Sequence, residues 1–84
     1  MEHRLVIPKS VQKNLNKIRG KDKKRIISVL VSLSRDPYLG KKLEGKHKTE
    51  WSYRVWPYRI IYQILKKESV ILVIRIGHRQ GVYQ

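Results

Sequence analysis

The first half of the chain repeats apolar residues at helical spacing. A short apolar run, HRLVI at 3–7, predicts a strand, and Pro8 ends it because proline cannot donate a hydrogen bond to a strand ladder. Apolar residues then recur every three or four positions over 10–19, which predicts an amphipathic helix; they are Val11, Leu15 and Ile18. A wider apolar stripe predicts a second helix over 22–33. Together the two segments are typical of a helical hairpin.

The second half changes to the pattern of strands. Residues 34–50 hold Asp36-Pro37, two glycines and a charge run, and predict a loop with a short strand near Leu43. β-Branched and aromatic residues then dominate three segments separated by turns, which predict an antiparallel meander of strands at 51–56, 58–65 and 70–76. This order predicts an α+β fold, β-α-α-β-β-β, with the hairpin packed on one face of a twisted, mainly antiparallel sheet. The 84 residues are expected to form one domain (1–84).

Alternation along the strands assigns each residue to a face of the sheet. We expect the helix-covered face to carry Tyr58, Ile60, Tyr62 and Ile64, together with Leu72, Ile74 and Ile76. Among the aromatic residues, core packing is the main interpretation for Trp51, Tyr53, Tyr58 and Tyr62. The opposite, open face is expected to carry Arg59, Arg75 and, if the last strand continues, Arg79 and Tyr83. Four apolar residues share the parity of the open face and would need a covering partner: Ile61, Leu65, Ile71 and Val73.

The net charge of the chain indicates what kind of partner it binds. Twenty Lys and Arg against six Asp and Glu give a formal net charge of +14, which favours a polyanion, and nucleic acid is the expected one. No apolar stretch is long enough to span a bilayer, so no membrane partner is expected. With no cysteine and only three scattered histidines, neither a disulfide nor a zinc site is predicted. No targeting segment is recognised, and a cytoplasmic location is expected.

Two stretches carry a family resemblance. YRIIYQI (58–64) and IRIGHRQGVYQ (74–84), taken with the length, the charge and the helical hairpin, resemble the RelE/ParE superfamily of toxins from toxin–antitoxin systems, and the RelE branch in particular. The resemblance implies a ribosome-dependent endoribonuclease that cuts messenger RNA in the decoding site, by attack of a ribose 2′-hydroxyl on the adjacent phosphate. It implies no metal and no cofactor. The implied partners are the ribosome, messenger RNA and a cognate acidic antitoxin that holds the toxin inactive.

The same resemblance implies roles for individual residues. Arg59 and Arg79 match the family's arginines that stabilise the phosphate in the transition state. Tyr83 matches the C-terminal tyrosine, which stacks on or orients a base or helps proton transfer, and His78 is a candidate acid or base. Arg54 matches a basic position that contacts the RNA backbone. Three further basic residues are expected to bind RNA: Arg75, Lys46 and Lys48.

One position departs from the family pattern. The best-known RelE-type enzymes carry two lysines on the strand that leads into this block, where the present chain has Glu50 and Ser52. Lys46 and Lys48 lie close by in the sequence and would substitute if the loop brings them in. Glu50 is the alternative, as a carboxylate general base. The identity of the base stays open on the sequence alone.

Two other functions compete with the nuclease. The first is a ParE-like inhibitor that binds DNA gyrase and cuts nothing, because fold alone does not establish function. The second is a non-catalytic RNA-binding module, in which the positive charge is a general footprint for phosphate. The combination of Arg59, Arg79 and Tyr83 favours the nuclease, since a protein that only binds does not need them in one place.

Overall fold

The computed structural model describes residues 2–78, apart from the side chain of His47. The elements, in chain order, are β1 (Arg4–Val6), α1 (Lys9–Lys17), α2 (Gly20–Arg35), η1 (Pro37–Leu39), β2 (Lys41–Lys42), η2 (Gly45–His47), β3 (Trp51–Val55), β4 (Tyr58–Leu65) and β5 (Val70–His78). The predicted order β-α-α-β-β-β is confirmed. The short strand expected near Leu43 is β2, which lies just before that residue. Among residues 2–78, no helix has the length and apolar character needed to cross a membrane.

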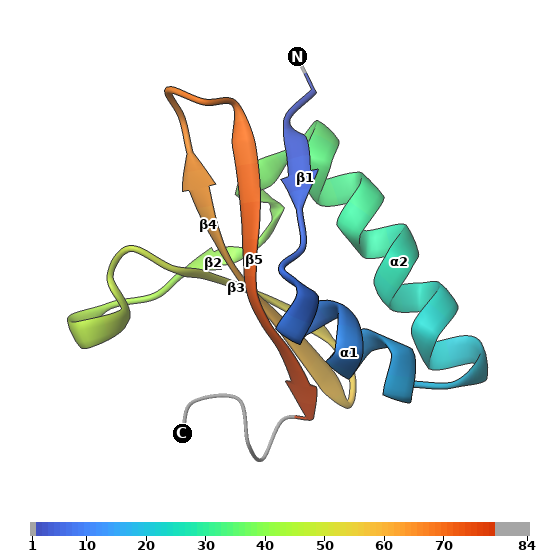
Figure 1. Cartoon of the computed structure of the whole chain (residues 1–84). Helices are drawn as coiled ribbons and strands as arrows, with labels where there is room; N and C mark the ends of the chain where they lie inside the picture. The colour runs from blue at the N-terminus through green and yellow to red at the C-terminus, as the bar shows by residue number, and fades with distance from the viewer. Residues whose placement is uncertain (1, 79–84) are drawn as a thin grey trace.

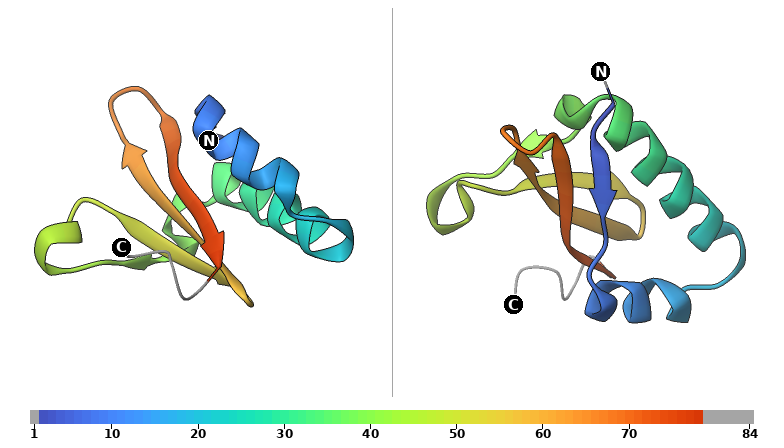
Figure 2. Two further views of the ribbon diagram at one scale, coloured as in Figure 1. Left: turned by 60° about the horizontal axis from the view of Figure 1, so that its bottom comes forward. Right: turned by 45° about the horizontal axis from the view of Figure 1, so that its top comes forward.

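The strands form one mixed sheet in the order β1-β5-β4-β3-β2. β1 pairs with β5 in parallel, and the other neighbouring pairs are antiparallel, so the predicted, mainly antiparallel sheet is confirmed. In Figures 1 and 2 both helices lie on the same side of the twisted sheet. The connection between β2 and β3 extends away from the helices and carries η2 at its tip. Helices α1 and α2 therefore cover one face of the sheet and not the other, although Ser52 and Ile61 on the helix-free face are also buried.

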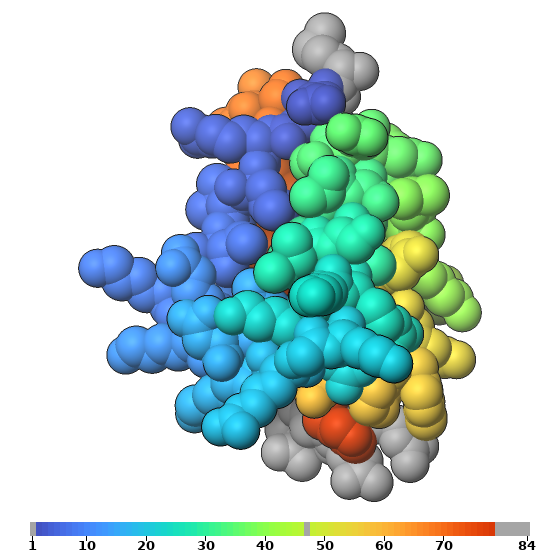
Figure 3. All heavy atoms as spheres, turned by 90° about the vertical axis from the view of Figure 1, so that its right-hand side faces the viewer, coloured from blue at the N-terminus to red at the C-terminus, as the bar shows by residue number. Residues whose placement is uncertain are grey.

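The helices bury the apolar stripes that the sequence predicts, except for Ile27 and Val31 of α2, which are exposed. Gly20 has a positive φ of 61°, a backbone conformation that suits glycine, and it turns the chain between the helices. The stripes pack against one face of β3, β4 and β5 and form the core. Its buried members are Val11, Leu15, Ile18, Ile26, Leu30 and Leu33 from the hairpin and Val55, Ile60, Tyr62, Ile71, Val73 and Ile76 from the sheet. Viewed from the helical side in Figure 3, α1 and α2 cover most of the sheet.

The aromatic residues of β3 and β4 belong to this core, as predicted. Tyr62 is completely buried, and Trp51, Tyr53 and Tyr58 pack against the core. The Trp51 ring stacks on Tyr62 with centroids 6.5 Å apart. These rings therefore stabilise the fold.

The face assignment of β5 is wrong for part of the strand. Ile76 packs in the core as expected, but Leu72 and Ile74 do not, and Ile71 and Val73 take their place. The cause is a β-bulge, because Ile61 pairs with Arg75 while the next residue, Tyr62, pairs with Val73 and leaves Ile74 as the extra residue. One extra residue reverses the alternation along the rest of the strand. Ile71 and Val73 thus need no covering partner.

Candidate functional site

Three arginines from neighbouring strands lie on the uncovered face of the sheet. Arg54 of β3 pairs directly with Arg59 of β4, and Arg59 pairs with Gly77 of β5. In the next row Ile61 pairs with Arg75. The strand neighbours of Arg54 and Arg59 point into the core, so these two arginines point to the opposite face. Arg75 shares that face because it pairs with Ile61, two residues after Arg59. The prediction that Arg59 and Arg75 share one face is confirmed.

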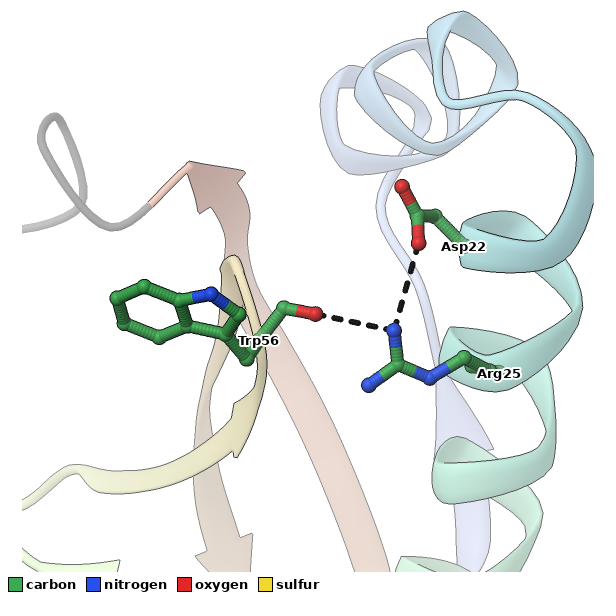
Figure 4. Close-up of polar contacts among 3 residues, drawn as sticks. All are labelled: Asp22, Arg25 and Trp56. Carbon is green, nitrogen blue, oxygen red and sulfur yellow. Dashed lines mark hydrogen bonds and ion pairs between the residues drawn. The ribbon is translucent and has the colours of Figure 1, made fainter.

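A helix residue fixes the turn that joins two of these arginines. β3 and β4 are connected at 56–57, directly between Arg54 and Arg59. The Arg25 guanidinium of α2 donates a hydrogen bond of 3.0 Å to the Trp56 carbonyl oxygen and lies 3.4 Å from the Asp22 carboxylate (Figure 4). The exposed ion pair contributes little stability by itself. Asp22 orients the Arg25 guanidinium toward the 56–57 turn. This contact links the turn between Arg54 and Arg59 to α2.

A hollow beside the arginines is lined by a further cationic residue, Lys41, which the sequence did not indicate. We call it the β2 groove; it has a volume of about 480 Å³ and is lined by Leu39, Gly40, Lys41, Leu43, Ser52, Tyr53, Arg54 and Arg59. Lys41 enters it because β2 pairs with β3, with Lys41 opposite Ser52. A strand of two residues has too little alternation to predict its register. The groove combines three cationic side chains with two leucines, a suitable lining for phosphate and sugar.

A buried tyrosine hydroxyl holds the start of β2 in place. Tyr62 Oη donates a hydrogen bond of 2.7 Å to the Pro37 carbonyl oxygen and accepts one of 3.1 Å from the Gly40 N–H. A side chain at Gly40 would meet the Tyr62 hydroxyl and would lie 2.8 Å from the Ser52 carbonyl oxygen. Burial raises the pKa of Tyr62 to about 12, although the Gly40 N–H works in the opposite direction. This arrangement, the Tyr62 clamp, presses residues 37–40 against the sheet.

We expect Tyr62→Phe to lower the free energy of unfolding by about 1–3 kcal/mol, because the Gly40 N–H and the Pro37 carbonyl lose their shared partner. Urea unfolding of both proteins near neutral pH measures the difference. Equal midpoints and slopes in the two proteins would contradict the clamp.

The clamp also predicts a fall in stability at alkaline pH. The folded-state pKa of Tyr62, about 12, lies above the value of about 10 expected in the unfolded chain. The folded protein then binds more protons than the unfolded one as pH rises from about 10 to about 12, so this contribution is complete below pH 10 and is lost across that interval. The loss is on the order of 2 kcal/mol. Tyr62→Phe lacks this contribution, so the difference between the pH profiles of the two proteins isolates the hydroxyl.

The structure separates His78 from the arginine face. His78 is the last residue of β5 and pairs with Tyr58, whose ring packs on the core side. The two rings meet edge to face, with centroids 5.9 Å apart. A second hollow, next to α1, contains them; it is lined by Asn14, Lys17, Ile18, Tyr58, Ile76, Gly77 and His78. His78 therefore lies on the helical side of the sheet, opposite Arg59 and Arg75.

The remaining predicted residues lie in three places. Glu50 directly precedes β3, and its carbonyl oxygen accepts a hydrogen bond of 2.9 Å from Leu43 N–H. Lys46 lies in η2 and Lys48 follows it, both exposed on the extended connection between β2 and β3 (Figure 2). The loop does not bring these two lysines into the lining of the β2 groove. The other two predicted catalytic residues, Arg79 and Tyr83, lie outside the described residues.

This basic chain, with a mixed five-stranded sheet and a helical hairpin on one face, has the fold of the RelE toxins. Residues 5–83 match the model of the ParE toxin of the type II toxin–antitoxin system parDE. The chain belongs to this family, and the predicted RelE/ParE membership is confirmed. No curated protein sequence matches the chain significantly.

Solved structures show the same fold. The toxin–antitoxin complex RelBE2 from Mycobacterium tuberculosis matches with a TM-score of 0.86 at 22% identity, over 94% of this chain and 100% of that one. The archaeal RelE–RelB complex from Pyrococcus horikoshii matches with a TM-score of 0.83 at 26% identity, over 98% and 100%. The RelB–RelE complex from Methanococcus jannaschii matches with a TM-score of 0.73 at 25% identity, over 94% and 95%. The chain is thus a toxin of a toxin–antitoxin system with a RelE-like structure.

Proposed function

We propose that this toxin is an endoribonuclease that cuts messenger RNA on the ribosome. The observation that carries the proposal is the placement of Arg54, Arg59 and Arg75 on one open face of three adjacent strands. A guanidinium remains charged at every physiological pH and offers a planar set of donors to two phosphate oxygens. Held on rigid strands, such donors stabilise the negative charge that develops on a phosphate under attack.

The proposed reaction is an internal transfer. The ribose 2′-oxygen bonds to the adjacent phosphorus, the bond from phosphorus to the 5′-oxygen breaks, and the 5′-oxygen takes up a proton from water, which leaves a 2′,3′-cyclic phosphate and a 5′-hydroxyl. Arg59 and Arg79 stabilise the phosphate, Tyr83 orients a base, and Glu50 is the candidate that accepts the 2′-hydroxyl proton. The step as written requires neither a metal ion nor a cofactor. We assign no step to His78, because its ring packs on Tyr58 on the helical side.

The charge of the chain supports the proposed setting. A net charge of +14 favours association with ribosomal RNA and with an acidic protein alike. Toxins of the same fold occur in complexes with RelB antitoxins, which supports a cognate antitoxin as the neutralising partner. We propose that the chain acts as a single domain in the cytoplasm, where messenger, ribosome and antitoxin meet.

The test is primer extension on a translated messenger in a purified cell-free system. Wild-type protein is compared with the Arg59→Ala/Arg79→Ala double variant, with and without ribosomes. The proposal expects cuts within codons that require both ribosomes and the wild-type protein, and that disappear when the antitoxin is added. An intact messenger beside well-folded wild-type protein would overturn it.

One observation favours a second function, inhibition of DNA gyrase. The matching family model describes ParE toxins, and members of the same fold need not be nucleases. The gyrase supercoiling reaction separates the two, since a ParE-like protein blocks supercoiling and leaves messenger intact. A third outcome, tight binding of free RNA with steep salt dependence and no cutting, identifies a non-catalytic RNA-binding module.

A further inference from the structure

We propose that Lys41 is a further RNA-contacting residue and that the β2 groove holds the phosphodiester backbone of the RNA between Lys41 and Arg54. This inference rests on the proposed function, because it names an additional part of the same RNA site. It assigns Lys41 to binding and positioning of the RNA, next to the arginines that face the reacting phosphate.

The register of four strands places Lys41 in line with the arginines. Lys41 pairs with Ser52, Ser52 with Ile61, and Ile61 with Arg75, so these residues form one row across β2, β3, β4 and β5. The row of Arg54, Arg59 and Gly77 lies two residues further along, a shift of about 7 Å. Lys41 of the first row and Arg54 and Arg59 of the second row all line the β2 groove. An extended RNA backbone laid along it would meet charge at successive phosphates.

The backbone that carries Lys41 is held in place by hydrogen bonds and close packing. A strand of two residues has few ladder hydrogen bonds, but the Tyr62 clamp fixes the backbone immediately before it. Gly40 packs so closely on Tyr62 and on the Ser52 carbonyl that no side chain fits there. The backbone before Lys41 is thereby held against the sheet, while its side chain is exposed. A fixed backbone with an exposed ammonium group suits the binding of an anion from another molecule.

The lining of the groove matches a nucleotide better than an isolated ion. Leu39 is 47% exposed, and with Leu43 it offers apolar surface next to the cations. A lysine ammonium grips phosphate as a point charge, without the geometric demand of a guanidinium. The leucines would then contact the ribose or the base attached to that phosphate.

The neighbouring residue provides a matched control. Lys42 has the same charge, lies in the same two-residue strand and is also exposed, but it pairs with Trp51 and points to the opposite face. It is not part of the groove lining. Lys41→Ala and Lys42→Ala therefore remove the same charge from the chain, one from the groove and one from outside it.

The experiment measures binding of a short single-stranded RNA by fluorescence anisotropy between about 50 and 200 mM salt, and ribosome-dependent cutting by primer extension. We expect Lys41→Ala to weaken RNA binding about tenfold and to lower the slope of log K against log salt by about 0.7. Lys41→Arg should restore most of the binding, and Lys42→Ala should behave like wild type. Thermal unfolding of each variant verifies the fold.

Each outcome decides the inference. If Lys41→Ala binds and cuts like wild type, or if Lys41→Ala and Lys42→Ala lose binding equally, the groove is not an RNA site. If wild type binds RNA through Lys41 but cuts nothing with ribosomes, the inference holds and the proposed nuclease fails. If wild type does not bind the short RNA but still cuts messenger with ribosomes, the inference fails and the proposed nuclease stands. If it neither binds nor cuts, both are overturned.

Discussion

Arg59→Ala is expected to lower the rate of messenger cutting by about 10²–10³-fold while the protein remains folded, because loss of one preorganised transition-state donor has an effect of this size. Arg59 lies at the centre of the open face, between Arg54 on β3 and Gly77 on β5. Its half-buried side chain is held on a strand that is paired on both sides within the sheet. Arg59 also lines the β2 groove, next to Arg54.

Two further variants make the measurement specific. Arg59→Lys keeps the charge but not the planar pair of donors, and should recover only part of the rate. Arg35→Ala removes an exposed arginine at the end of α2, whose ion pair with Glu2 at 3.7 Å contributes little. It should cut like wild type. Primer extension under single-turnover conditions gives the rates, and equal rates for Arg59→Ala and wild type would remove Arg59 from the site.

Periodicity predicted the elements of this fold because each one is amphipathic. Ile26, Leu30 and Leu33 recur at helical spacing and form the buried stripe of α2. Ile60 and Tyr62 alternate with Arg59 in β4, so their parity alone assigns the arginine to the open face. A helix or strand that buries one face leaves this record in its sequence.

The parts that could not be predicted depend on pairing between strands. The bulge at Ile74 lies within an apolar run in which both parities look equally suited to the core, so the sequence holds no sign of the reversal. Lys41 was missed for a related reason, since its place opposite Ser52 is set by the Tyr62 clamp and not by the pattern of β2 itself. His78 is different, because it shares the parity of Ile76 and alternation alone assigns it to the helical side.

The arginines of the open face and the groove wall around Lys41 are positioned by different interactions, and the candidate site depends on both. The arginines are placed by the same alternation that forms the core, so they persist as long as the sheet does. The groove wall around Lys41 depends on one buried hydroxyl and one glycine, and it can be disturbed without unfolding the sheet. Substitutions at Gly40 therefore test whether the wall contributes to function.

We expect Gly40→Ala to lower the free energy of unfolding by about 1–3 kcal/mol, the usual cost of overpacking. The added methyl group would meet the Tyr62 hydroxyl and the Ser52 carbonyl oxygen, and the second contact is with backbone that cannot rotate away. Relief requires β2 to move off β3, which carries Lys41 out of its row. Urea unfolding measures the stability, and RNA binding should fall about tenfold, as for Lys41→Ala.

A double-mutant cycle with Tyr62→Phe separates this contact from a general effect of the methyl group. In Gly40→Ala/Tyr62→Phe the hydroxyl that the methyl group meets is absent, and only the Ser52 carbonyl remains in its way. The double variant should then be more stable than the sum of the single effects predicts, by about 1 kcal/mol. Additive effects would mean that the clamp and the glycine act independently, and the position of Lys41 would no longer follow from them.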